Sequence, residues 1–137
     1  MVCIFCGNKK TSVTNSRPQD KGTRTWRRRS CQKCLQSFTT NEIADDSELQ
    51  IINSNNEATP FNTGRLIISI YSCFLHDQES GSSASYWLAL SIKQTLVQKL
   101  VEDELISSRD IAKATHEALS RFDNVAAIQY AAREGLL

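Results

Sequence analysis

Cys3-Ile4-Phe5-Cys6 stands near the start of this chain, and Cys31-Gln32-Lys33-Cys34 repeats its spacing after 24 intervening residues. Each Cys-x-x-Cys pair can supply two thiolates to one ion, and four soft ligands favour tetrahedral zinc. A site closed by four protein ligands stabilises the fold and leaves no position open for chemistry. The spacing therefore predicts one structural Zn²⁺ held by Cys3, Cys6, Cys31 and Cys34, against the alternative that two short Cys pairs occur here by coincidence.

Three short β-prone segments lie between and after the two cysteine pairs. Residues 11–16 and 24–30 are rich in Thr, Ser and Arg, and residues 18–22 between them carry turn-forming residues. Residues 37–40 form the third segment. Three strands held together by the two cysteine pairs predict an all-β zinc ribbon over residues 1–45.

The cysteine count also bears on the compartment. Four of the five cysteines lie in the two Cys-x-x-Cys pairs, called hooks below. This count fits zinc binding in a reducing compartment better than a disulfide framework. The fifth, Cys73, is predicted to be a buried apolar thiol. No run approaches the about 20 apolar residues that span a bilayer, and no signal region precedes Cys3. We therefore expect a cytoplasmic protein without membrane contact.

The formal net charge of +1 conceals an uneven distribution. Residues 1–40 carry nine basic and one acidic side chain, a net charge of +8, whereas the remaining 97 residues carry seven basic and 14 acidic side chains, a net charge of −7. Charge of one sign concentrated on a small module points to a polyanionic partner, most commonly nucleic acid. We expect DNA as the partner, with RNA or a protein as the alternatives.

Three consecutive arginines lie directly before the second cysteine pair, on a strand whose position the metal would fix. Side chains alternate along a strand, so Arg27 and Arg29 are expected on one face and Arg28 on the other. Some of them should bind phosphates, while one or two reach a groove and read guanine. Arg17 and Lys33 are predicted to extend the same DNA-binding surface.

A second domain is predicted over residues 46–137, after a linker at residues 41–47. Residues 48–53 have the pattern of a strand, residues 54–57 form a polar turn, and residues 58–61 form a short return strand limited by its proline. A β-hairpin therefore opens this domain.

Helical periodicity begins at Asn62, a predicted N-cap. Residues 76–85 are expected to form an exposed loop, Ser107 and Asp110 a capping-box pair, and Gly135 the end of the last helix. The apolar stripes expected to face the core are Leu66, Ile67, Ile70 and Phe74; Trp87, Leu88, Ile92, Leu96 and Leu100; Ile111, Ala114, Ala118, Leu119 and Phe122; and Val125, Ile128, Ala131 and Ala132. A zinc ribbon followed by a hairpin and about four helices makes the fold class α+β.

No catalytic constellation is found in the sequence. His76 and His116 have no neighbouring Cys or paired carboxylate that would activate them. Residues 102–104, Glu-Asp-Glu at the expected end of the second helix, are typical of a solvated helix end rather than a metal site. A Walker-type Gly-x-x-x-x-Gly-Lys stretch is absent. We therefore expect a regulator and not an enzyme.

Further motifs are Asn15-Ser16-Arg17-Pro18, Arg27-Arg28-Arg29-Ser30-Cys31 and Phe38-Thr39-Thr40-Asn41-Glu42. Together with the cysteine pairs they make the chain resemble the NrdR family of bacterial transcriptional repressors over nearly its full length. The resemblance implies a zinc ribbon that binds operator DNA upstream of ribonucleotide reductase genes, followed by an ATP-cone that senses ATP and dATP. Double-stranded promoter DNA is therefore the expected partner, and association with the nucleoid is expected with it. It also implies a homo-oligomer whose size changes with the bound nucleotide.

The resemblance further implies a nucleotide site at Ile51, Asn53, Thr59 and Arg65. Asn53 stands where the family's strand usually carries a lysine, Thr59 where a glutamate is usual, and Arg65 replaces a lysine with its charge kept. Trp26, which we expect to fill the ribbon's core rather than stack on a base, stands where a fourth arginine is usual. Loss of one charged contact to a polyphosphate costs about 1.5 to 3 kcal/mol.

Two rival hypotheses remain. In one, the chain is a nucleotide-insensitive DNA-binding protein whose ATP-cone serves only oligomerisation. In the other, it is a zinc-ribbon adaptor for RNA or protein.

Overall fold

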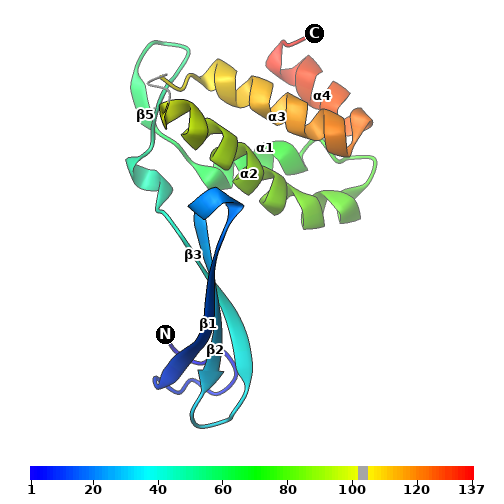
Figure 1. Ribbon diagram of the computed structural model, residues 1–137. Helices are drawn as coiled ribbons and strands as arrows, with labels where there is room; N and C mark the ends of the chain where they lie inside the picture. The colour runs from blue at the N-terminus through cyan, green and yellow to red at the C-terminus, as the bar shows by residue number, and fades with distance from the viewer. Residues whose placement is uncertain (102–104) are drawn as a thin grey trace. The chain divides into compact units, whose positions relative to one another are not determined.

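The computed structural model describes residues 1–101 and 105–137, and the chain divides into two compact units, Met1–Asp45 and Asp46–Leu137. The expected solvated helix end at residues 102–104 lies outside the described residues. A ribbon of strands followed by a hairpin and four helices confirms the α+β class (Figure 1). Within the described residues, none of the helices has the length and apolar character needed to cross a membrane.

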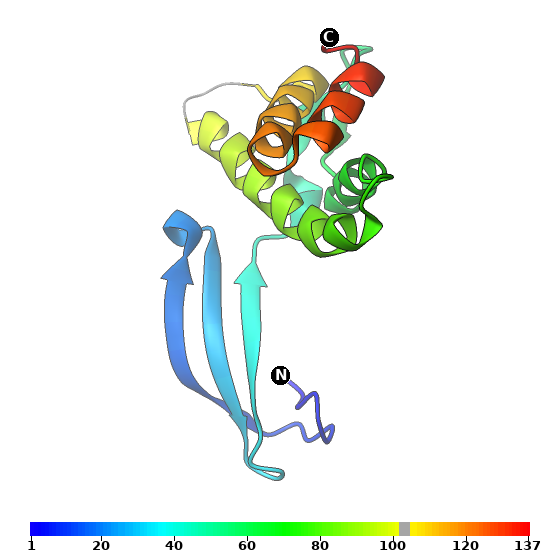
Figure 2. The ribbon, with the colours of Figure 1, turned by 90° about the vertical axis from the view of Figure 1, so that its right-hand side faces the viewer.

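The first unit is a three-stranded antiparallel sheet, which Figure 2 shows as a long twisted ribbon. Its strands are β1 (Thr11–Gln19), β2 (Arg24–Cys31) and β3 (Ser37–Ile43), with β2 in the centre. A β-bulge between Val13 and Asn15 shifts the register of β1. The core of this unit contains little more than Cys3, Cys31 and Phe38, so the metal site has to replace a hydrophobic core.

The strands of this unit are longer than the sequence pattern predicts. The expected turn at residues 18–22 is shorter, because β1 continues through Pro18 to Gln19 before the turn η1 (Asp20–Gly22). Pro18 is tolerated there because β1 is an edge strand. The linker predicted at residues 41–47 is also shorter, because β3 extends to Ile43.

The second unit begins with the turn η2 (Asp46–Glu48) and the predicted hairpin, β4 (Gln50–Ile52) paired with β5 (Ala58–Pro60). The helices that follow in the described residues are α1 (Thr63–Tyr71), α2 (Gln78–Val101), α3 (Ser108–Phe122) and α4 (Asn124–Glu134). Along the chain each helix packs on the next. The hairpin is tied to the segment before α3, because the N–H of Ile52 donates to the carbonyl of Ile106 at 2.8 Å.

Side chains cap the helices largely as predicted. Asn62 Oδ1 accepts from the N–H of Arg65 at 2.9 Å, and Ser107 and Asp110 form the reciprocal capping box. Asp123 caps α4 through the N–H of Ala126, and Gly135 ends that helix with φ 65°. Asp123 also contacts His76 Nε2 at 3.0 Å, a carboxylate partner that sequence spacing did not reveal.

The predicted loop at residues 76–85 is wrong. Helix α2 begins at Gln78 and includes Gly81, where an added Cβ would lie 2.5 Å from Phe74 Cβ. The glycine therefore leaves room for Phe74, which precedes α2, and does not break the helix.

The core of the second unit follows the predicted stripes only in part. Leu66, Ile70, Phe74, Ile92, Leu96 and Leu119 are buried as expected. Trp87, Phe122, Val125 and Ile128 are exposed, and the core positions of their helices are instead Ala89, Ala112, Thr115, Ala126, Ala127 and Tyr130. Most of these buried positions hold small side chains, which a pattern of large apolar residues does not reveal. Cys73 is buried in this core, as predicted.

Candidate metal centre and nucleic-acid interface

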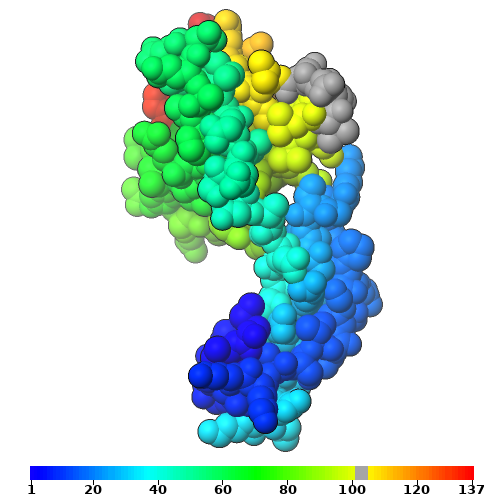
Figure 3. All heavy atoms as spheres, turned by 90° about the vertical axis from the view of Figure 1, so that its left-hand side faces the viewer, coloured from blue at the N-terminus to red at the C-terminus, as the bar shows by residue number. Residues whose placement is uncertain are grey.

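The four cysteines of the two hooks converge on one point. The Sγ atoms of Cys3, Cys6, Cys31 and Cys34 all lie within 4.8 Å of one another. Cys3 and Cys34 are 3.6 Å apart at sulfur, as are Cys6 and Cys31. A tetrahedral ion with Zn–S bonds of about 2.3 Å separates its sulfur ligands by roughly 3.8 Å, so the cluster fits a single zinc-sized ion. Figure 3 shows the segments that carry the two hooks side by side at one end of the sheet.

The two hooks have the same backbone geometry. The N–H of Phe5 donates to Cys3 Sγ and the N–H of Lys33 donates to Cys31 Sγ, both at 3.4 Å. Asn8 Nδ2 adds a contact of 3.7 Å to Cys31 Sγ. Such donors stabilise thiolates and orient them toward the ion. Asn8 was not singled out from sequence, because a lone Asn after a knuckle has no distinguishing pattern.

The sulfurs differ in their preference for the thiolate form. The backbone N–H of Cys34, followed by those of Lys33 and the Asn8 side chain, lowers the pKa of Cys31 to about 6 against the effect of burial. The backbone N–H of Gln36 acts in the same direction on Cys34, yet burial and the neighbouring sulfurs raise its pKa to about 12. Four thiolates cannot share this volume without a cation, so the donor set calls for a metal.

The strand β2 carries the three arginines out from the metal site. In the sheet register Arg27 lies opposite Thr40 and Arg28 opposite Thr39. Successive side chains alternate, so Arg27 and Arg29 share one face and Arg28 the other, as predicted. Arg17 lies opposite Trp26 and therefore on the face of Arg28.

Side chains of β3 hold each of these arginines. Arg27 forms an ion pair with Glu42. Arg28 Nη1 donates to Thr39 Oγ1 and Arg29 Nε donates to Thr40 Oγ1, both at 3.1 Å. Thr39, Thr40 and Glu42 are thus further candidate functional residues. They belong to the Phe38 to Glu42 motif, but the sequence alone assigned them no role. Preorganised guanidinium groups lose less freedom on binding a phosphate or a base.

The other two predicted DNA-binding residues lie outside β2. Lys33 is exposed in the second hook, and Arg17 is exposed on the edge strand β1. Trp26 is half-buried in the sheet, next to Arg17 in register, and is not part of the small core.

The predicted nucleotide residues lie around the hairpin and the start of α1. Ile51 and Thr59 are directly opposite each other in the hairpin, and Arg65 is exposed in the first turn of α1. At the same end, Asp46 of η2 forms an ion pair with Lys93 of α2 and accepts a hydrogen bond from Thr63.

Asn53 has a local role in the hairpin turn. Its Oδ1 accepts from the N–H groups of Asn55 and Glu57, both at 2.9 Å. Its Nδ2 donates to Glu57 Oε2 at 3.1 Å. The side chain is thus engaged within the turn, a use of Asn that is common in turns.

Comparison with known proteins agrees with this geometry. Residues 1–42 match a family model described as the N-terminal domain of transcriptional repressor NrdR-like proteins. The transcriptional repressor NrdR of Desulfitobacterium hafniense is 32% identical over an alignment of 139 positions. The alignment covers 96% of this chain and 83% of that protein. The NrdR repressor of Nitrosomonas europaea is 34% identical over 131 residues, covering 96% and 80%.

The chain belongs to the NrdR family of transcriptional repressors. The NrdR ribbon model matches nearly all of the first unit, and the NrdR relatives extend through the second. The resemblance seen in the motifs is therefore confirmed, and the relatives are named as regulators, not as enzymes. Within this NrdR chain, the substitutions stated above lie in the hairpin, at Asn53 and Thr59, and in the central strand, at Trp26.

Proposed function

We propose that this protein is a zinc-dependent repressor that binds double-stranded DNA at the promoters of ribonucleotide reductase genes. Cys3, Cys6, Cys31 and Cys34 hold one structural Zn²⁺, which fixes the end of β2 and thereby the row of arginines beside it. The observation that carries the proposal is this row, three guanidinium groups on one metal-clamped strand, each bonded to a side chain of β3. Arg17 and Lys33 add phosphate contacts.

Nucleotide control is the second part of the proposal. ATP and dATP bind around Ile51, Thr59 and Arg65 and favour one homo-oligomeric assembly over another. The second unit carries 12 acidic and seven basic side chains, a net charge of −5, and is not expected to bind DNA itself. Several ribbons displayed together by contacts between second units would gain avidity on one promoter in the cytoplasm.

DNA binding to a reductase promoter, with and without ATP and dATP, tests both parts. Neutralising four or five phosphates gives a log–log slope of affinity against salt of roughly −4. Association that does not depend on salt, or no preference for duplex DNA over RNA, would refute the DNA part.

A nucleotide-insensitive regulator is the second candidate, favoured by Asn53. Its side chain is engaged within the hairpin turn and carries no charge for a triphosphate. Calorimetry with ATP and dATP distinguishes the two candidates. Absence of binding heat at high micromolar nucleotide, with DNA binding intact, would select the insensitive regulator.

A further inference from the structure

The two cysteine hooks expose apolar side chains at the metal end of the sheet. Ile4 and Phe5 lie between the cysteines of the first hook and are 70% and 57% exposed. Leu35 directly follows the second hook and is 80% exposed. Because both hooks surround one metal site, these side chains lie at the same end of the ribbon, and we refer to Ile4, Phe5 and Leu35 as the apolar tip.

Leu35 has a backbone conformation that is unfavourable for leucine. Its φ is 60°, in the left-handed region, where a Cβ crowds the following carbonyl oxygen. The conformation belongs to the turn, in which the N–H of Leu35 donates to the carbonyl of Cys31 at 3.1 Å. Gly7 takes the equivalent place after the first hook, with φ 69° and its N–H bonded to the carbonyl of Cys3 at 3.0 Å. Glycine accepts this conformation without strain, so leucine is the poorer residue for the stability of the turn.

The leucine side chain does not offset that strain within the ribbon. The small core beside the metal consists of Cys3, Cys31 and Phe38, with Cys34 packed against it, and Leu35 is not part of it. A side chain that stays 80% exposed gains little from burial. A strained backbone under an exposed apolar side chain indicates a contact outside the folded unit.

The charges around the apolar tip are all of one sign. Lys9, Lys10 and Lys33 lie in or shortly after the hooks, and residues 1–19 and 25–41 contain no acidic side chain. The acids of this unit lie in η1 and at or after the far end of β3: Asp20, Glu42 and Asp45. An anionic partner with apolar groups fits this surface, whereas a second copy of the ribbon would bring like charges together.

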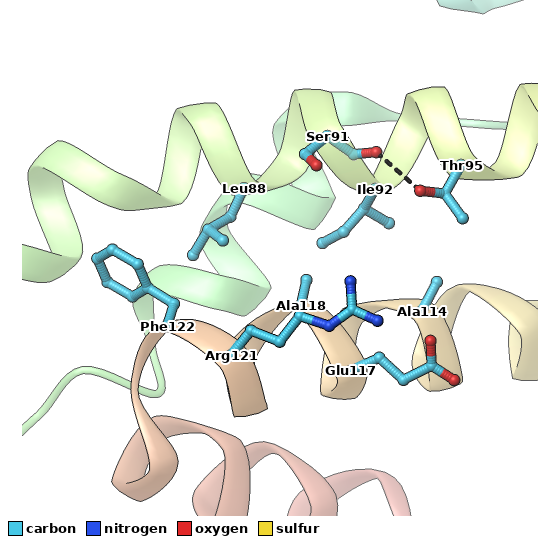
Figure 4. Close-up of a pocket in the computed structure, with 9 residues that line it drawn as sticks. All are labelled: Leu88, Ser91, Ile92, Thr95, Ala114, Glu117, Ala118, Arg121 and Phe122. Atoms are coloured by element: carbon cyan, nitrogen blue, oxygen red, sulfur yellow. Dashed lines mark hydrogen bonds between the residues drawn. The ribbon is translucent and has the colours of Figure 1, made fainter.

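The groove of about 380 Å³ between α2 and α3 has no such preference. Its lining includes Glu117 and Arg121, one charge of each sign (Figure 4). Unlike this groove, the apolar tip has surroundings that select the charge of its partner.

The apolar tip also continues the surface that carries the arginines. Arg29 lies directly opposite Phe38 in the sheet register, so the two side chains are on the same face. Phe38 in turn contacts Phe5 of the apolar tip, with ring centroids 6.5 Å apart. Lys33, which we expect to contact phosphate, lies two residues before Leu35. A duplex bound by Arg29 and Lys33 therefore lies within reach of the apolar tip.

We propose that the apolar tip reads bases, with Leu35 and its neighbours packed against thymine methyl groups in the major groove of the DNA. This inference rests on the proposed function and adds an apolar contact to those of the arginines. Thymine presents its C5-methyl group in the major groove, the same groove in which guanidinium groups read guanine. Burial of the leucine side chain against DNA offsets the strain of its backbone.

Two replacements of Leu35 test this contact. Leu35→Gly removes the side chain and Leu35→Asn makes it polar, and both new residues accept a positive φ more readily than leucine. Each variant should retain zinc against a chelator at least as well as the original chain. Each should nevertheless bind a reductase-promoter duplex about three- to tenfold more weakly, because an apolar contact is lost. The slope of log affinity against log salt should stay unchanged, because no charge is removed.

Leu137→Gly is the matched control, since Leu137 lies in the second unit and is 83% exposed. This variant should bind the promoter duplex as the original chain does.

A promoter duplex with deoxyuridine in place of thymidine supplies the second arm of the test. Uracil pairs as thymine does but lacks the methyl group. The original chain and Leu137→Gly should bind this duplex about three- to tenfold more weakly than the thymidine duplex. For Leu35→Gly the difference between the two duplexes should largely disappear, because the variant has already lost the methyl contact.

Fluorescence anisotropy of the labelled duplexes, with the full zinc-loaded chain, measures these affinities. Weaker binding by both Leu35 variants, with the salt slope kept and the loss absent on the deoxyuridine duplex, supports the proposal. Unchanged affinity in the variants, or an equal loss on both duplexes, overturns it while DNA binding as such stands, and the apolar tip then has a different occupant. A chain that does not bind the promoter duplex overturns the proposed function and this inference with it.

Discussion

Replacement of Gly81 by Ala is expected to destabilise the second unit, although alanine is the better helix former. The glycine lies inside α2, where an added Cβ would meet Phe74 at 2.5 Å from its Cβ and 2.8 Å from its Cγ. Phe74 is 0% exposed and belongs to the buried core cluster, so its ring can shift only if its neighbours shift too. The new methyl carbon is bonded directly to Cα, so its position is fixed by the backbone and it cannot rotate away from the ring.

The magnitude follows from two opposing terms. Alanine in place of glycine stabilises a helix interior by about 1 kcal/mol. Overpacking of a filled core costs typically about 1 to 3 kcal/mol, and two contacts below 3.0 Å with a fully buried ring place Gly81→Ala at the upper end. We expect a net loss of roughly 1 to 2 kcal/mol, which lowers Tm by about 4 to 8 °C per kcal/mol for a unit of this size.

Thermal and urea unfolding followed by circular dichroism at the helical signal measure the effect. Ser82→Ala, an exposed neighbour in the same turn, is the matched control and should be neutral or slightly stabilising. Phe74→Leu combined with Gly81→Ala should cost less than the sum of the single changes, because the smaller side chain makes room. A Gly81→Ala variant as stable as the original, or strictly additive energies, would refute the steric explanation.

Three further predictions concern the sites. Cys31→Ser, or removal of metal by a chelator, should unfold the ribbon and abolish DNA binding while the helical circular dichroism of the second unit persists; a ribbon that stays folded without metal would contradict the structural role. Arg28→Ala should weaken DNA binding and reduce the salt slope by about 0.9 if its guanidinium neutralises one phosphate, and an unchanged slope would remove it from the interface. The hydrogen bond from the N–H of Ala126, followed by that from His76, lowers the pKa of Asp123 below its ordinary value. The ionised carboxylate therefore stabilises the folded second unit at any pH above the pKa that Asp123 has in the unfolded chain. This contribution is lost as the pH falls through the lower pKa of Asp123 in the folded protein. Asp123→Asn should therefore flatten the acid limb of the stability profile of the second unit, and a limb as steep as in the original protein would argue against this role.

Local chemistry made parts of this protein predictable. Metal-ligand spacing is a local property, so two Cys-x-x-Cys hooks were enough to predict the sulfur cluster that the structure brings together. Helix caps are likewise decided within four residues, which explains why Asn62 and the pair Ser107 and Asp110 were predicted correctly. Strand alternation fixed the faces of Arg27 and Arg28 for the same reason.

Other features depend on what approaches from elsewhere in the chain. Glu42, Thr39 and Thr40 hold the arginines only because β3 pairs with β2 in one particular register. Asn53 occupies a site position by family resemblance, but its side chain is engaged by the turn that follows it.

The sequence by itself predicted the cysteine ligand set, the caps of α1 and α3 and the α+β class, because ligand spacing, capping pairs and the order of periodic segments can be read directly from the residues. Only the tertiary structure decided which face of α4 is buried and which large apolar side chains of α2 and α3 stay exposed. The sequence pattern places Gly81 in a loop, yet it lies within α2, where Phe74 approaches too closely to leave room for a side chain. Trp87 and Phe122 have the periodicity of core residues and lie exposed, whereas the small residues Ala89 and Ala112 of the same helices are buried. The hydrophobic pattern shows which residues of a helix are apolar. The packing of the helices against each other decides which of these residues are buried.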